Sequence, residues 1–273
     1  MPHPLDDAYE KVSGAAKHFD ALRAKVNEFD QANPNPFRPV IDPQTGEHVI
    51  DVGDPPVLSP EWSRMVGDIA HNLRSALDYL VYELSAEGGG DPGRERTAFP
   101  ISEDKGEYWK PKGRRKISYR DHCLAGVADS NKTKIDDIQP YHRKDPTRTH
   151  LSRLNHLSNR DKHRTAHPAY SMFETPGHIV STEHGETLSH VEIRYRPGTH
   201  DFSVQAKIER EPRPGRSIGM RADRKPQMDR RIGVTIAFGD RRITLDDLRA
   251  MIRHVKGILD WFKPAFGAAS ITN

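Results

Sequence analysis

Residues 149–167 have the sequence THLSRLNHLSNRDKHRTAH, in which an amphipathic helix pattern runs into a cluster of charged and titratable side chains. Leu151, Leu154 and Leu157 fall on one stripe at the helical step of about 100° per residue. The same stripe continues through Asp161, where a further leucine would be expected. An unpaired buried carboxylate is costly, so Asp161 must have a cationic partner or mark the end of the helix. We therefore expect this helix to lie against another that supplies a donor.

The most regular candidate for that second helix covers residues 59–86. Its apolar residues form one narrow stripe, and on the opposite side His71, Arg74 and Asp78 lie within about 60° of one another by the helical step. Two interpretations remain open. Arg74 and Asp78 form a solvated i,i+4 pair that contributes about 0.3–0.5 kcal/mol, or this face meets another helix across a polar cleft that brings Asp161 close to Arg74 or His71.

The remaining pattern predicts an α+β fold, with a helical bundle and an adjoining antiparallel β-sheet in the C-terminal half. Long amphipathic segments, ended by proline or glycine, predict the helices. They cover residues 5–31, 59–86, 147–165 and 244–263, with a short helix at 129–138. Alternating apolar and polar residues predict strands within 169–239 and a hairpin at 38–52. The strands are expected at residues 179–182, 188–196, 202–209 and 232–238.

Composition limits the class of protein. The chain has 273 residues, of which 34% are hydrophobic and 30% charged, which suits a single folded domain over residues 1–273 with a modest core. One cysteine, Cys123, excludes an intrachain disulfide framework and a multi-cysteine zinc site. No apolar run reaches the ~18 residues that span a bilayer, and the first residues lack a signal-peptide pattern. We expect a cytoplasmic protein without a membrane partner.

The charge is unevenly distributed, although the net charge is only +3. Residues 105–164 contain 16 Lys/Arg and 7 Asp/Glu, a net charge of +9, which leaves 26 and 32 elsewhere, a net charge of −6. This segregation predicts an anionic partner or a contact between the two parts.

Within this basic region, residues 105–120 contain seven basic residues interleaved with Tyr108, Trp109 and Tyr119. Cations for phosphates beside aromatic faces for bases are typical of single-stranded nucleic-acid sites, although a solvated loop has the same composition. The candidate nucleic-acid-binding residues are Trp109, Lys110, Lys112, Arg114, Arg115, Lys116 and Arg164.

Four blocks carry a resemblance to known proteins. HNLRSALDYLVYEL (71–84), FPI (99–101), DDIQPYH (136–142) and NRDKHR (159–164) together resemble a family of bacterial proteins, mostly from actinomycetes, whose function is unknown. The resemblance covers roughly residues 60–165. It implies that the two polar helix segments belong together, and it supplies no activity.

A weaker resemblance is to the HEPN ribonucleases, helical bundles whose sites use Arg, a polar residue, four to six further positions and then His. Arg160-Asp161 followed by His167 fits that spacing. The resemblance implies metal-independent RNA cleavage, with a histidine as general acid or base and arginine stabilising the phosphate. The candidate catalytic residues are His71, Arg74, Arg160, Asp161, His163 and His167.

Two alternatives to catalysis follow from the same residues. His163 and His167 are four positions apart and would share a metal on a continuous helix, but no glutamate follows His163 as in zinc proteases and no cysteine cluster assists. We therefore predict no metal site and no cofactor. The other alternative is a non-enzymatic interaction module, in which these residues form a buried polar network that locks two helices together. The sequence predicts RNA or a nucleotide as partner and is compatible with a homodimer.

Overall fold

The computed structural model confirms an α+β fold with a helical bundle. It describes residues 2–33, 38–41, 48–51, 57–95, 97–112, 116–161, 168–174, 179–181, 186–188, 190–195, 202–207, 232–238 and 243–267. The chain divides into two compact units. The first consists of Met1–Val26, Ser59–Ala169 and Ile236–Asn273, and the second of Asn27–Leu58 and Tyr170–Thr235. The single-domain organisation expected from the sequence stays a prediction.

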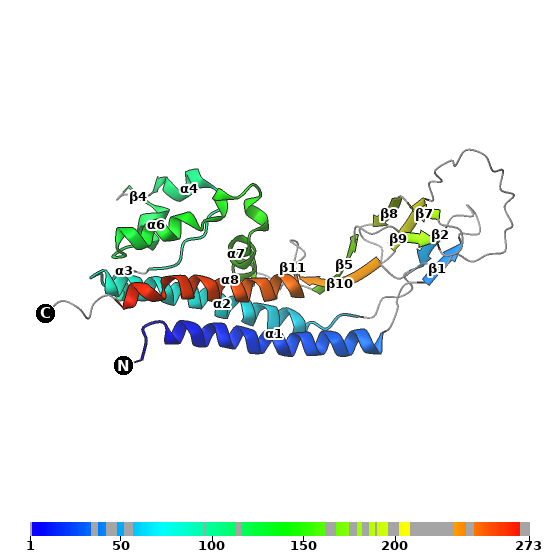
Figure 1. Ribbon diagram of the computed structural model, residues 1–273, viewed down its shortest axis with the longest axis horizontal. Coiled ribbons are helices and arrows are strands. Elements are labelled where there is room, and N and C mark those ends of the chain that lie inside the picture. The colour runs from blue at the N-terminus through cyan, green and yellow to red at the C-terminus, as the bar shows by residue number, and fades with distance from the viewer. Residues whose placement is uncertain are drawn as a thin grey trace. The chain divides into compact units, whose positions relative to one another are not determined.

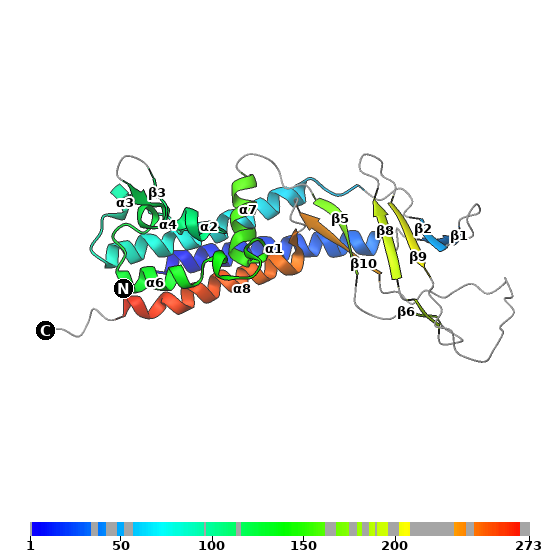
Figure 2. The same cartoon turned by 90° about the horizontal axis from the view of Figure 1, so that it is seen from above.

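Three long helices form the bundle of the first unit, the first of them with its residues up to Val26, and α7 (His150–Asp161) runs across them (Figures 1 and 2). They are α1 (Asp6–Ala32), α2 (Glu61–Glu87) and α8 (Leu245–Phe262). The apolar stripe of each helix is buried, as its spacing predicts. Tyr9 of α1 donates a hydrogen bond to Asp260 of α8 at 2.7 Å, which ties these two helices together at their surface.

Helix α7 has the core face that the leucine pattern predicts. Leu151, Leu154 and Leu157 are all buried, and α7 contacts both α2 and α8, which confirms the expected pairing of α2 and α7. The helix begins later than expected because residues 146–148 form the 3₁₀ turn η2 (Pro146–Arg148). Thr149 then acts as a cap, its hydroxyl accepting a hydrogen bond from the Ser152 amide at 3.2 Å.

Short elements fill the connection between α2 and α7. They are α3 (Pro92–Glu95), α4 (Lys105–Trp109), β3 (Pro111–Lys112), β4 (Ile117–Ser118), α5 (Tyr119–Cys123), α6 (Asp129–Asp137) and the 3₁₀ turn η1 (Pro140–His142). Helix α6 matches the expected short helix, whereas α4 and α5 were not expected. Both have side-chain caps, since Asp104 accepts from the Glu107 amide and Ser118 accepts from the Asp121 amide.

The end of α2 shows why glycine is needed at residues 88–90. Gly89 has a φ of +82°, a left-handed conformation that favours glycine. A Cβ on Gly88 would lie 2.2 Å from the carbonyl oxygen of Gly126, so the turn can pack against this neighbouring loop only without a side chain. The Ser85 hydroxyl supports the same contact by donating to the Ala125 carbonyl at 2.8 Å.

The strands of the four-stranded sheet and of the β6–β7 pair run antiparallel to their neighbours. A four-stranded sheet has the order β1–β2–β9–β8, from β1 (Arg38–Ile41), β2 (His48–Asp51), β8 (His190–Tyr195) and β9 (Phe202–Lys207). The pairing of Val40 with Val49 confirms the expected hairpin. A second pair joins β6 (Ile179–Ser181) to β7 (Glu186–Leu188).

A three-stranded sheet has the order β11–β10–β5, from β5 (Pro168–Glu174), β10 (Ile232–Phe238) and β11 (Ile243–Thr244). Strand β5 was not among the expected strands.

After β11 the chain enters α8, which is followed by the 3₁₀ turn η3 (Lys263–Phe266). Within the described residues, no helix is both long and apolar enough to cross a membrane.

Candidate functional site

The polar residues of α2 hold the backbone of Phe99. Arg74 Nη2 lies 3.1 Å from Asp78 Oδ1 and donates a hydrogen bond of 2.5 Å to the Phe99 carbonyl oxygen. The Phe99 amide in turn donates to Asp78 Oδ1 at 2.8 Å. The expected i,i+4 pair is therefore present, and it satisfies both backbone groups of a residue whose side chain is buried. His71 on the same helix is exposed and takes no part in these contacts.

Gln139 also binds the backbone of the segment that follows Phe99. Its side chain is buried, and its Nε2 donates to the carbonyl oxygens of Pro100 at 2.9 Å and Ile135 at 3.1 Å. Its Oε1 accepts from the Ser102 amide at 3.0 Å. We call Arg74, Asp78 and Gln139 the clamp, because together they satisfy four backbone groups between residues 99 and 102.

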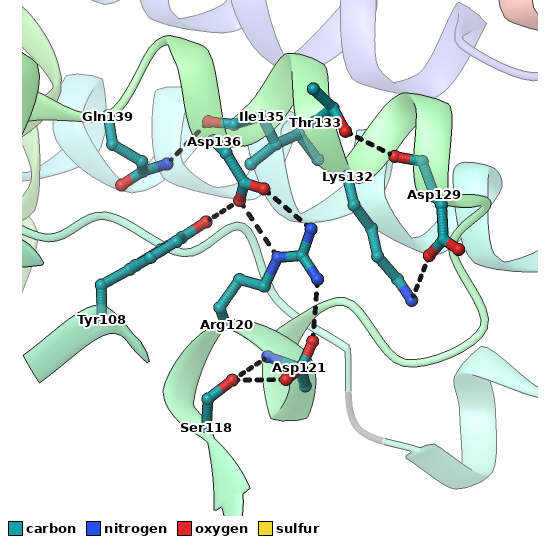
Figure 3. Close-up of polar contacts among 10 residues, drawn as sticks. All are labelled: Tyr108, Ser118, Arg120, Asp121, Asp129, Lys132, Thr133, Ile135, Asp136 and Gln139. Atoms are coloured by element: carbon teal, nitrogen blue, oxygen red, sulfur yellow. Dashed lines mark hydrogen bonds and ion pairs between the residues drawn. The ribbon is translucent and has the colours of Figure 1, made fainter. Parts of the chain in front are cut away.

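A second polar cluster joins α4, α5 and α6 around Asp136 (Figure 3). Arg120 donates from Nη2 to Asp136 Oδ2 at 2.7 Å and from Nε to Oδ1 at 3.1 Å, a two-point contact. The Tyr108 hydroxyl donates to Asp136 Oδ1 at 2.7 Å. Burial and this hydrogen bond raise the pKa of Tyr108, so the phenol stays a donor. We call Tyr108, Arg120 and Asp136 the Asp136 network.

The Asp136 network neutralises Arg120, a cation of the basic segment 105–120 that the sequence suggested for nucleic-acid binding. The Arg120 guanidinium lies 4.9 Å from the centroid of the Trp109 ring and pairs with Asp136 and Asp121. Trp109 remains 41% exposed, but a cation already occupies one side of the ring. Lys110 pairs with Glu107 at 3.2 Å.

The structure places only some of the other candidate nucleic-acid-binding residues. Lys116 is exposed in the turn before β4. The side chain of Lys112 lies outside the description, as do Arg114, Arg115 and Arg164.

Most of the candidate catalytic residues also lie outside the description. The backbones of Arg160 and Asp161 belong to the last turn of α7, but their side chains are not described, and His163 and His167 lie outside the described residues. Arg74 is described and serves the clamp. The expected contact between Asp161 and Arg74 or His71 therefore stays a prediction.

Cys123 lies in the same part of the unit and is buried. Burial raises the pKa of its thiol to about 11, in spite of the nearby Arg74, and raises the pKa of the Tyr119 phenol to about 12. A thiol that is protonated at neutral pH is a poor nucleophile and a poor metal ligand. Among the described residues, no group of three or more His, Cys, Asp and Glu side chains is arranged to hold a metal ion.

A different cluster forms where α7 crosses α8. The rings of His150 in α7 and His254 in α8 lie 5.4 Å apart, centroid to centroid, and each side chain is partly exposed. Burial is the main cause that lowers the pKa of both histidines. Arg153 and Arg253 lower the pKa of His150 further, against the opposing effect of Asp247, and His150, if protonated, and Arg143 lower the pKa of His254. Both imidazoles are therefore neutral at neutral pH.

Three arginines lie near one or the other of these rings, and only one of the three forms an ion pair within the described residues. Arg153 forms an ion pair with Asp247, whose carboxylate also completes the capping box of α8 with Thr244. Arg143 and Arg253 are exposed and form no ion pair with any described residue. We call Arg143, His150, Arg153, Arg253 and His254 the cationic cluster. With neutral histidines and Asp247 included, its net charge is +2.

Sequence reasoning missed the cationic cluster because its members come from distant parts of the chain. His150 starts α7, Arg143 precedes η2, and Arg253 and His254 lie on the polar side of α8. The available signal was the excess of basic residues in 105–164, which did not indicate which of them would remain unpaired. The packing of α7 across α8 determines which of these basic residues remain unpaired.

Comparison of the chain with protein-family models, with curated proteins and with solved structures gives no match.

Proposed function

We propose that the protein binds RNA or a nucleotide through the cationic cluster, and that the polar residues of α2 maintain the fold. The observation that carries the proposal is that Arg143 and Arg253 are exposed, lie close enough to the His150–His254 pair to act on its charge, and have no ion-pair partner among the described residues. Guanidinium groups that are not neutralised within the protein are suited to phosphate, which they contact through two parallel hydrogen bonds.

The charge distribution supports an anionic partner of this kind. Residues 105–164 carry the basic excess, yet several of their cations are neutralised locally, including Lys110, Arg120 and Lys132. The cations without an ion-pair partner in the described part of this region include Arg143 and Lys144, on the connection between η1 and α7. Binding of a polyanion to such a surface releases counterions from the nucleic acid, which gives affinity without base contacts.

The clamp supports a non-enzymatic interaction module in place of a ribonuclease site on α2. Arg74 is only 16% exposed and is engaged by Asp78 and by the Phe99 carbonyl, so its charge serves the fold. A catalytic arginine would instead face the position of a phosphate in the transition state. RNA binding at the cationic cluster needs no catalytic arginine. A structural clamp on α2 and an RNA-binding cationic cluster are therefore compatible in one protein.

The proposal predicts salt-dependent RNA binding that depends on two arginines. Fluorescence anisotropy of a fluorescein-labelled single-stranded RNA should show affinity that falls with salt, each neutralised phosphate contributing a slope of about −0.7. The double variant Arg143→Glu/Arg253→Glu should lose about tenfold or more in affinity, and its slope should be shallower by about 1.4.

The matched control for this measurement is Lys17→Glu/Arg94→Glu, which changes the charge by the same amount at two exposed positions on α1 and α3. It should keep most of the affinity. Absence of RNA binding by the unaltered protein at low salt would overturn the proposal. An equal loss in the control variant would also overturn it, because binding would then depend only on net charge.

A further inference from the structure

The two histidines of the cationic cluster are in an unusual position. Both imidazoles come from facing helices, their rings are in contact range at 5.4 Å, and cations adjoin both of them. His150 Nδ1 is buried and has no hydrogen-bond partner among the described residues. A buried polar atom is normally paired, and this one becomes a further N–H donor when the imidazole is protonated.

We propose that His150, His254, Arg143 and Arg253 form a binding site for a single phosphate group, and that bound phosphate and protonated imidazole stabilise each other. The proposal rests on the proposed function and makes it more specific, since it assigns the phosphate contact to four side chains. The ligand chemistry is a phosphate ester, either the diester linkage of RNA or the terminal phosphate of a nucleotide.

The charges around the imidazoles determine how the site responds to pH. On α7, Arg153 opposes protonation of His150; on α8, Arg253 opposes it and Asp247 favours it. His254 is opposed by Arg143 and by His150 itself. A phosphate placed among these groups adds negative charge, which favours the protonated imidazole and so raises the histidine pKa. The two arginines stay charged throughout the accessible pH range.

Proton uptake on binding then follows from the sign of this change. In the free protein the pKa of each histidine is below 6.5, so both rings are neutral near pH 7. In the complex the histidine pKa is higher. At any pH between the pKa of the free protein and that of the complex, the complex therefore binds more protons than the free protein. Affinity for a phosphate ester therefore increases as the pH falls, by up to about tenfold per pH unit for each proton taken up.

NMR titration of the histidine ring protons tests the site independently of RNA binding. Two probes are used, each against sodium chloride of the same ionic strength: dimethyl phosphate, which resembles an RNA linkage, and 5′-AMP, which carries a terminal phosphate. Signals are assigned by their loss in His150→Gln and His254→Gln. We expect at least one probe to raise the pKa of both histidines, and we expect Arg143→Gln/Arg253→Gln to abolish the effect.

The two probes distinguish the source of the phosphate. A response to dimethyl phosphate assigns the site to the RNA backbone, and a response to 5′-AMP alone assigns it to terminal phosphates. Unchanged histidine pKa values with both probes would overturn the phosphate site even if RNA binds elsewhere. Conversely, a response to a probe in a protein that does not bind RNA would contradict RNA as the partner and retain the site. Circular dichroism of each variant verifies that it is folded.

Discussion

Replacement of Asp136 by alanine is expected to lower the free energy of unfolding by about 3–5 kcal/mol, because it removes the carboxylate that pairs with a nearly buried guanidinium. The side chains of Arg120 and Asp136 are only 13% and 14% exposed, and their atoms approach to 2.7 Å. The substitution also leaves the buried Tyr108 hydroxyl without its acceptor. Urea unfolding followed by circular dichroism measures the change.

Asp137 provides the control for this substitution. It is the next residue of α6, it is exposed, and it forms no ion pair with a described residue. Asp137→Ala should change the free energy of unfolding by less than about 0.5 kcal/mol. If Asp136→Ala were no more destabilising than Asp137→Ala, the Asp136 network would not hold α4, α5 and α6 together.

Replacement of Gln139 by alanine should lower the free energy of unfolding by about 2–4 kcal/mol. The side chain is 1% exposed, and its loss would leave the Pro100 carbonyl and the Ser102 amide without this partner, with a cavity beside them. Gln139→Met keeps most of the volume and removes only the hydrogen bonds, so it separates the two contributions. Differential scanning calorimetry and urea unfolding provide the measurement.

One result would contradict a stabilising role of the Gln139 hydrogen bonds. If Gln139→Met were as stable as the unaltered protein while Gln139→Ala was destabilised, packing alone would account for the residue. The clamp would then contribute through volume, and the hydrogen bonds to residues 100 and 102 would be energetically neutral. Ser130→Ala, at an exposed position on α6, serves as the baseline.

The fold could be predicted from the sequence to the extent that helical periodicity determines it. The apolar stripes of α2 and α8 and the leucines of α7 predicted these helices and their buried faces. The pairing of α2 with α7 was predicted from Asp161 on the leucine stripe of α7, and the two helices are in contact. The short helices α4 and α5 could not be predicted, because five residues are too few for periodicity and their caps, Asp104 and Ser118, are common residues in loops.

The candidate site could be predicted less well, because a side chain's partner depends on tertiary contacts. One of the two interpretations of α2 paired Arg74 with Asp78 on a solvated face. The pair is present, but Arg74 is only 16% exposed, and no pattern in the sequence indicates that the two residues hold the backbone of Phe99. Likewise, nothing in residues 150 and 254 suggests that their rings meet. Composition identified a basic region, and only the packing of α7 on α8 distinguishes neutralised cations from those available to a ligand.

We propose that Arg74 serves the fold, whereas Arg143 and Arg253 serve binding. One measurement tests it directly: the dissociation constant for the same single-stranded RNA, determined under identical low-salt conditions for Arg74→Gln and for Arg143→Gln/Arg253→Gln. We predict that Arg74→Gln lowers the melting temperature but leaves the affinity unchanged, and that the double variant melts normally but binds RNA more weakly. The reverse pattern, with affinity lost in folded Arg74→Gln and retained in the double variant, would contradict the account.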